Sequence, residues 1–182
     1  ENQTQVWVNG VNRGTLNAGK FMTLNFQQDE VASIKTDKPS AVTVFAKSQN
    51  CNDRNQPFFD QGDPFMITYS PNQQLLTSIT FNALQLPSIV NHYVNVIVKT
   101  AEVDATRLDG NNIGNRFSPI PGSSEYSYAR INIGAGVHSL NNRGGLIAYV
   151  YGFGYIESYG FAVGASLDNL NFLTDSEYEF DV

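Results

Sequence analysis

Apolar and polar residues alternate along most of this chain. The alternation is regular at residues 22–26 and 94–98, and no stretch keeps a helical period. Because successive side chains of a β-strand point to opposite faces, a period of two predicts strands with one buried face. The pairs Asn9-Gly10, Asp109-Gly110 and Gly144-Gly145 suit the positive φ angles of tight hairpin turns. The sequence therefore predicts an all-β fold, an antiparallel β-sandwich or a jelly-roll-like arrangement of short strands.

The alternating runs divide the chain into short segments of strand. We expect strands at residues 5–8, 21–26, 31–36, 41–46, 66–69, 75–81, 93–99, 106–108, 126–133, 136–140, 146–153 and 160–163. Residues 48–63 interrupt this rhythm, because they are rich in Asn, Asp and Gln and contain Pro and Gly. We therefore predict an N-terminal β subdomain at 1–50, a linker or long loop at 51–63, and a main β-sandwich domain at 64–182.

A weak internal repeat underlies this division. Residues 6–10 and 41–45, with an aromatic and aliphatic strand between them, are echoed in the same order by 106–110, 126–133 and 147–151. The N-terminal unit is accordingly interpreted as a partial or minimal repeat of the second. One sandwich and two packed β subdomains are both consistent with this pattern.

Charge and cysteine content exclude several classes of protein. The chain has 182 residues with 11 Lys and Arg against 17 Asp and Glu, a net charge of −6, and no basic cluster that could follow a phosphate backbone. No apolar run approaches the roughly 20 residues that cross a bilayer. Cys51 is the single cysteine, which excludes a disulfide scaffold and a cysteine-rich zinc site. We expect neither a nucleic-acid partner nor membrane insertion.

Residues for catalysis are scarce. The two histidines, His92 and His138, stand at strand edges beside alternating apolar residues, where a structural role is expected. No Gly-x-Ser-x-Gly elbow of a hydrolase is present. Acid pairs such as Glu102 and Asp104 occur in any chain with this many carboxylates. We expect a protein that is not an enzyme and has no catalytic residues.

Loop oxygens also suggest a metal site. Asp53, Asp63, Asp109 and Asn111 lie in loops and carry the oxygen ligands that calcium prefers, but their spacing is not that of an EF-hand. Turn chemistry is the simpler interpretation, because Asn and Asp side chains hydrogen-bond their own backbone. We expect no metal ligands and no cofactor, with loop-bound calcium as the alternative.

Two strands carry candidate ligand-binding side chains. At 147–155 the alternation places Ile and aromatic residues on one face and small residues on the other. We expect that aromatic face to pack into the core; if its tyrosines remain exposed, they form a platform for sugar or protein. At 126–133 the even positions are expected to face outward with the Tyr and Arg composition of a binding face. The ligand-binding candidates are Tyr126, Tyr128, Arg130, Asn132, Tyr149 and Tyr151.

Several separated motifs resemble a known family. They are Thr36-Asp37-Lys38-Pro39, Gly62-Asp63-Pro64-Phe65-Met66, Asn91 to Val98, Arg107-Leu108-Asp109-Gly110, Phe117-Ser118-Pro119-Ile120, Gly136 to Leu140, Tyr151-Gly152-Phe153 and Glu157 to Phe161. In this order they resemble the N-terminal domain of the IgG Fc-binding protein, a family also found in surface and secreted proteins of Bacteroidetes-type bacteria. The resemblance implies an extracellular or cell-surface β-rich module with a role in adhesion or ligand binding. The shared motifs look like turns and core, so no contact residues are carried over.

These observations predict a non-catalytic extracellular binding or adhesion module of a larger surface or secreted protein, recognising protein or glycan. A structural spacer in a surface stalk and a carbohydrate-binding module attached to an enzyme are the alternatives. Exposed aromatic platforms would favour sugar. A mixed Tyr and Arg patch of standard interface size, roughly 800 Å² per partner, would favour protein.

Overall fold

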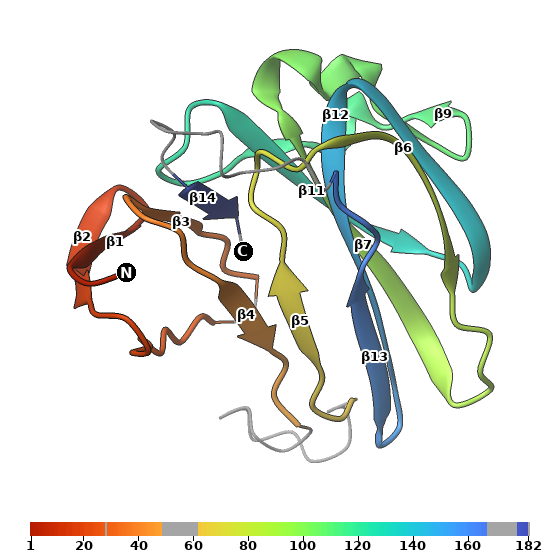
Figure 1. The fold of residues 1–182 in the computed structure, drawn as a ribbon. Coiled ribbons are helices and arrows are strands. Elements are labelled where there is room, and N and C mark those ends of the chain that lie inside the picture. Colours follow the sequence, from red (N-terminus) through yellow and green to blue (C-terminus); the bar gives the residue numbers. More distant parts are fainter. Residues whose placement is uncertain (28, 49–61, 167–177, 182) are drawn as a thin grey trace.

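The chain folds almost entirely into antiparallel strands (Figure 1). The computed structural model describes residues 1–27, 29–48, 62–166 and 178–181. The elements are β1 (Thr4–Val8), β2 (Val11–Leu16), β3 (Ser33–Thr36), β4 (Val42–Phe45), β5 (Met66–Tyr69), β6 (Leu76–Ala83), β7 (Ile89–Lys99), η1 (Thr100–Ala105), β8 (Arg107–Leu108), β9 (Asn111–Asn112), η2 (Gly114–Arg116), β10 (Ser118–Pro119), β11 (Tyr126–Ile133), β12 (Gly136–Gly154), β13 (Glu157–Ala162) and β14 (Tyr178–Asp181). The predicted all-β, sandwich-like fold is confirmed.

The large sheet is built around β12. Its eight strands follow the order β10-β11-β7-β12-β8-β9, with β13 and β6 also paired to β12. The C-terminal half of β12 pairs with β7 and β13, whereas its N-terminal half pairs with β6 and β8. The sheet therefore curls, and the main core lies inside the curl (Figure 1). Val94, Val96 and Val98 on β7 line this core, as the alternation at 94–98 predicted.

A bend rather than a turn joins the two halves of β12. Strands were expected at 136–140 and 146–153 with a hairpin turn at Gly144-Gly145, and that turn is wrong, because one strand runs through the whole region. Buried Asn142 explains the difference. Its Nδ2 donates to Glu102 O at 2.9 Å and to Thr106 Oγ1 at 2.7 Å, and its Oδ1 accepts from the Gly144 N–H at 2.8 Å. These bonds hold an irregularity that bends the chain without reversing it.

The other two predicted hairpin turns are confirmed. Asn9 and Gly10 have φ angles of 51° and 76° and connect β1 to β2. Asp109 and Gly110, with φ angles of 50° and 79°, connect β8 to β9 in the same way. Two successive positive φ angles match the twist of antiparallel strands, which is why Asn-Gly and Asp-Gly are favoured there.

The expected strand at 21–26 is wrong. Met22, Leu24 and Phe26 pack against the core formed by β1 and β3, as the alternation predicts, but residues 21–26 have no ladder partner among the described strands. The neighbour of β1 is instead β2, which is polar and was not expected as a strand. Alternation of apolar and polar residues therefore predicts that one side of a segment is buried. It does not predict strand pairing, which depends on which other segment lies next to it.

Both smaller sheets join distant parts of the chain. One has the order β14-β3-β1-β2, and the other consists of β4 and β5. Each thus pairs residues from before position 50 with residues from after position 62. The division into 1–50, 51–63 and 64–182 and the internal repeat stay predictions, and most of the proposed linker, 51–61, lies outside the described residues.

The β4–β5 pair packs on the outer side of the large sheet. The Tyr69 ring stacks on Tyr149 with centroids 3.8 Å apart and planes 9° apart. Phe65, just before β5, stacks on Tyr151 at 6.2 Å and lies directly over Gly160 of β13. The close approach requires glycine, because a Cβ at position 160 would lie 2.4 Å from the Phe65 ring.

We predict that Gly160→Ala lowers the free energy of unfolding by about 1–3 kcal/mol, since the added methyl must displace Phe65 and Ile67 from a packed interface. Urea unfolding followed by tyrosine fluorescence measures the change. Gly134→Ala is the matched control, because a Cβ there meets no atom within 4 Å. Equal destabilisation by both substitutions would contradict this account of the packing.

Candidate binding face

The pairing register brings the predicted site residues onto one face of the large sheet. Arg130 of β11 lies opposite Asn95 of β7, which lies opposite Tyr149 of β12. In the next row, Asn132 lies opposite Tyr93, which lies opposite Tyr151. Tyr126 and Tyr128 are on the same side of β11, because they alternate with the buried positions. We call this side of β11, β7 and β12 the outer face.

Part of the outer face is covered. Tyr149 is 1% exposed and Tyr126 is 7% exposed, and both pack with Ile120 and Ile147 in a second core beneath the β4–β5 pair. The expectation that Tyr126 looks out to solvent is therefore wrong, because Tyr126 packs into this second core. The expectation that the aromatic face of 147–155 packs into the core holds for Ile147 and Tyr149.

The rest of the outer face is open to a partner. Tyr128, Arg130 and Tyr151 are half-buried, and Asn132 is exposed. Tyr93, which is not among the residues predicted from the sequence, is half-buried beside them. The regular alternation of β7 was the signal, because the pattern that turns Val94 and Val96 inward turns Tyr93 and Asn95 outward.

Contacts between neighbouring strands fix the side chains of the open part. Tyr93 stacks on Tyr151 with ring centroids 5.4 Å apart, and the Tyr151 hydroxyl donates to Asn95 Oδ1 at 3.1 Å. Burial raises the pKa of Tyr151 to about 12, although the nearby charge of Arg130 opposes that rise. The hydroxyl therefore stays protonated at neutral pH and acts as a fixed hydrogen-bond donor.

Arg130 borders a small pocket at one end of the open part. Its Nη1 forms an ion pair with Asp29, which lies in the segment between β2 and β3. Among the described residues its buried Nε has no hydrogen-bond partner. The pocket has a free volume of about 30 Å³ and is lined by Glu30, Val31, Tyr69, Asn95, Ile97, Ile120, Tyr128, Arg130 and Tyr149. Such a pocket accepts a water molecule or the tip of one side chain, whereas pockets for small-molecule ligands are about tenfold larger.

The histidines occupy structural positions away from the outer face. His92 is buried, and its Nδ1 lies 2.9 Å from the Tyr159 hydroxyl. His138 Nδ1 lies 2.7 Å from Asp109 Oδ2, and its Nε2 lies 2.9 Å from Gly134 O, so His138 ties the β8–β9 hairpin to β12. In the described ranges, no three His, Cys, Asp or Glu side chains gather as metal ligands would.

Comparison with known proteins identifies the family. The family model described as IgGFc binding protein matches residues 1–152, so the chain belongs to this family. The match confirms the resemblance and extends it to residues before Thr36, while the motif at 157–161 lies beyond it. The family is one of binding domains and is not a known enzyme family.

No curated protein and no solved structure matches the chain. A search of the described residues for a helix long and apolar enough to span a membrane finds none.

The His138–Asp109 pair makes stability depend on pH. Partial burial alone would lower the pKa of His138, but its hydrogen bonds to Asp109 and Gly134 outweigh burial and raise it. Partial burial alone would raise the pKa of Asp109, but hydrogen bonds from His138 and Ser139 lower it. The His138 contribution is complete below its unfolded pKa of about 6.5 and disappears as the pH rises through its folded pKa. The Asp109 contribution is complete above about pH 3.9 and is lost as the pH falls through its folded pKa.

We therefore predict that His138→Gln costs roughly 0.5 kcal/mol between about pH 4 and 6.5, the scale of a partly exposed ion pair, and less at higher pH. Urea unfolding of both proteins across the pH range measures the difference. Asp109→Asn should remove the same pH dependence above pH 6. A His138→Gln cost that stays constant with pH would show that charge makes no contribution here.

Proposed function

We propose that this chain is a non-catalytic, extracellular module of a larger surface or secreted protein, and that it binds a protein partner through the open part of the outer face. Membership of the IgGFc-binding family supports a binding role. The observation that carries the proposal is the register that places Tyr93, Arg130 and Asn132 side by side on β7 and β11. Tyr and Arg are enriched at protein interfaces, and here the sheet holds them in place.

The geometry favours protein over glycan as the ligand. A sugar ring stacks on a flat, accessible aromatic surface, but Tyr93, Tyr151 and Phe153 are half-buried and pack against one another. A protein partner can contact ring edges, amides and the guanidinium together and insert one side chain into the pocket beside Arg130. The buried Arg130 Nε offers that side chain a hydrogen-bond donor.

The ion pair with Asp29 supports the same proposal. It restrains the side chain of Arg130, which borders the pocket. Ordering a free arginine on binding costs about 0.5–1.5 kcal/mol, so a restrained one loses less entropy when a partner arrives. Glu30 also borders the pocket, which favours a neutral polar side chain of the partner over an acidic one.

The test is surface plasmon resonance of the purified chain over immobilised IgG Fc, the partner that the family name suggests. Tyr93→Ala and Asn132→Ala are expected to weaken binding by about tenfold each, the effect of removing one interface anchor. Asn82→Ala is the matched control, because Asn82 is an exposed Asn on β6, outside the outer face.

Three results would contradict the proposal. Equal loss with Asn82→Ala would mean that the outer face is not the interface. Binding to a glycan array that Tyr93→Ala abolishes would assign the same face to sugar. No detectable binding to Fc, to other serum proteins or to glycans would favour a structural spacer.

A further inference from the structure

The turn between β12 and β13 consists of two apolar residues, and one of them has an unfavourable backbone conformation. Gly154 pairs with Glu157, which leaves Tyr155 and Ile156 as a two-residue turn. Tyr155 is 74% exposed and Ile156 is 50% exposed. Ile156 has a φ of 58°, and a β-branched residue in this left-handed region is strained where Asn or Gly would not be. Such strain is characteristic of positions kept for function.

A second apolar loop lies against this turn. The loop between β6 and β7 exposes Leu84 and Leu86, and Val90, the second residue of β7, is 63% exposed. Ser88 of this loop hydrogen-bonds Glu157, and a Cβ added at Gly154 would collide with the Ser88 carbonyl. The two turns are therefore in contact. We call Leu84, Leu86, Val90, Tyr155 and Ile156 together the apolar end.

The core does not account for these exposed side chains. Ile89, the first residue of β7, already fills the inner position next to this loop and packs in the main core. The Ile89 N–H donates to Leu86 O at 3.1 Å, which holds the loop in a tight turn. The exposed residues cannot move inward without displacing Ile89. Single exposed apolar residues are ordinary, but adjoining ones on two restrained turns indicate an interaction surface.

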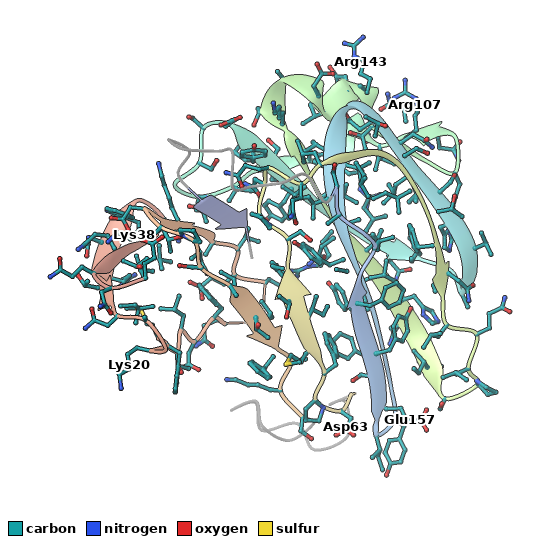
Figure 2. The ribbon with its side chains drawn as sticks, viewed as in Figure 1. Lys20, Lys38, Asp63, Arg107, Arg143 and Glu157 are labelled. Atoms are coloured by element: carbon teal, nitrogen blue, oxygen red, sulfur yellow. The ribbon has the colours of Figure 1, made fainter. Side chains whose placement is uncertain are left out.

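The charged residues beside the apolar end indicate which kind of partner fits it. Glu157 and Asp63 are both exposed and lie at the same end of the molecule, where the Ser158 side chain hydrogen-bonds the Asp63 backbone (Figure 2). Residues 62–65, 84–90 and 154–158 contain no Lys or Arg. The labelled Arg107 and Arg143 lie at the opposite end (Figure 2). Exposed Lys47 follows Ala46, whose N–H donates to Phe65 O at 2.9 Å, so one cation approaches this segment from the strand paired with it. Glu157 and Asp63 still give the border of the apolar end an excess of negative charge.

We infer that the apolar end is a second docking surface, separate from the outer face, for a protein whose apolar patch is bordered by Lys or Arg. A basic border complements Glu157 and Asp63 across the interface. A second copy of this chain fits less well, because a two-fold contact would place these acids against each other. A membrane fits less well too, because surfaces that bind anionic lipid carry basic residues.

Nuclear magnetic resonance on the ¹⁵N-labelled chain tests this inference with two peptides of equal apolar content. The probes are acetyl-Lys-Leu-Phe-Leu-Lys-amide and acetyl-Glu-Leu-Phe-Leu-Glu-amide. The basic peptide is expected to shift the amide signals of residues 84–86, 88–90 and 154–158 saturably, with an affinity about tenfold above that of the acidic peptide. Equal affinity for the two peptides, or no saturable shift at these residues, overturns the inference.

Substitutions separate docking from folding. Ile156→Asn removes the apolar side chain and relieves the strained φ, so it is expected to weaken the basic peptide by about tenfold while the melting temperature stays equal or rises. Val11→Thr is the matched control, because Val11 is an exposed valine in the small sheet, 56% exposed. Peptide binding that survives Ile156→Asn, or that falls equally with Val11→Thr, contradicts the inference.

Other occupants give distinct results. Dimerisation of the unmodified chain in sedimentation, lost with Ile156→Asn, would assign the apolar end to a second copy. Co-sedimentation with phosphatidylcholine and phosphatidylserine vesicles, lost in the same variant, would assign it to a membrane. Asn132→Ala should leave peptide binding unchanged, so failure of this surface and failure of the outer face remain distinguishable.

Discussion

The buried side-chain amide of Asn142 holds the bend on which the large sheet depends. By bonding to Glu102, Thr106 and Gly144, it replaces ladder hydrogen bonds that β12 gives up where it changes direction. Without that bend, β12 would continue straight and β6 would not face β7 across the main core. A single buried amide whose hydrogen bonds are all made inside the protein thereby sets the curvature of the large sheet.

Farther along, β12 and β13 alternate large and small side chains across their pairing. Tyr151 lies opposite Gly160, and Gly152 lies opposite Tyr159. Each glycine makes room on its own side of the sheet: Phe65 sits over Gly160 on the outer side, and the Tyr159 ring covers Gly152 on the inner side. This alternation lets β5 lie close to the sheet and cover Tyr149 while Tyr93 and Asn132 remain accessible.

The alternation of apolar and polar residues predicted much of the fold, but it could not predict which segments cover the faces of the large sheet. The alternation located β11 with its observed bounds, and it placed Arg130 and Asn132 on the face opposite the core. It could not show that β5 covers Tyr149 or that residues 21–26 have no partner among the described strands, because both depend on contacts between segments far apart in the chain. Gly144-Gly145 suggested a hairpin turn because two glycines suit positive φ angles. The sequence could not show that the chain only bends there, because the bend is held by Asn142 side-chain bonds to residues about 40 positions away.

The placement of β14 has a consequence for the order of folding. The last described strand pairs with β3, whose own partner is β1, so the small sheet joins the two extremes of the described chain. During synthesis β1, β2 and β3 emerge before the other described strands, and the edge of β3 that pairs with β14 has to wait for the last of them. An unpaired edge readily accepts a foreign strand, so arrival of β14 ends a vulnerable interval. The four-stranded sheet that contains β1 is therefore complete only after β14 has been made.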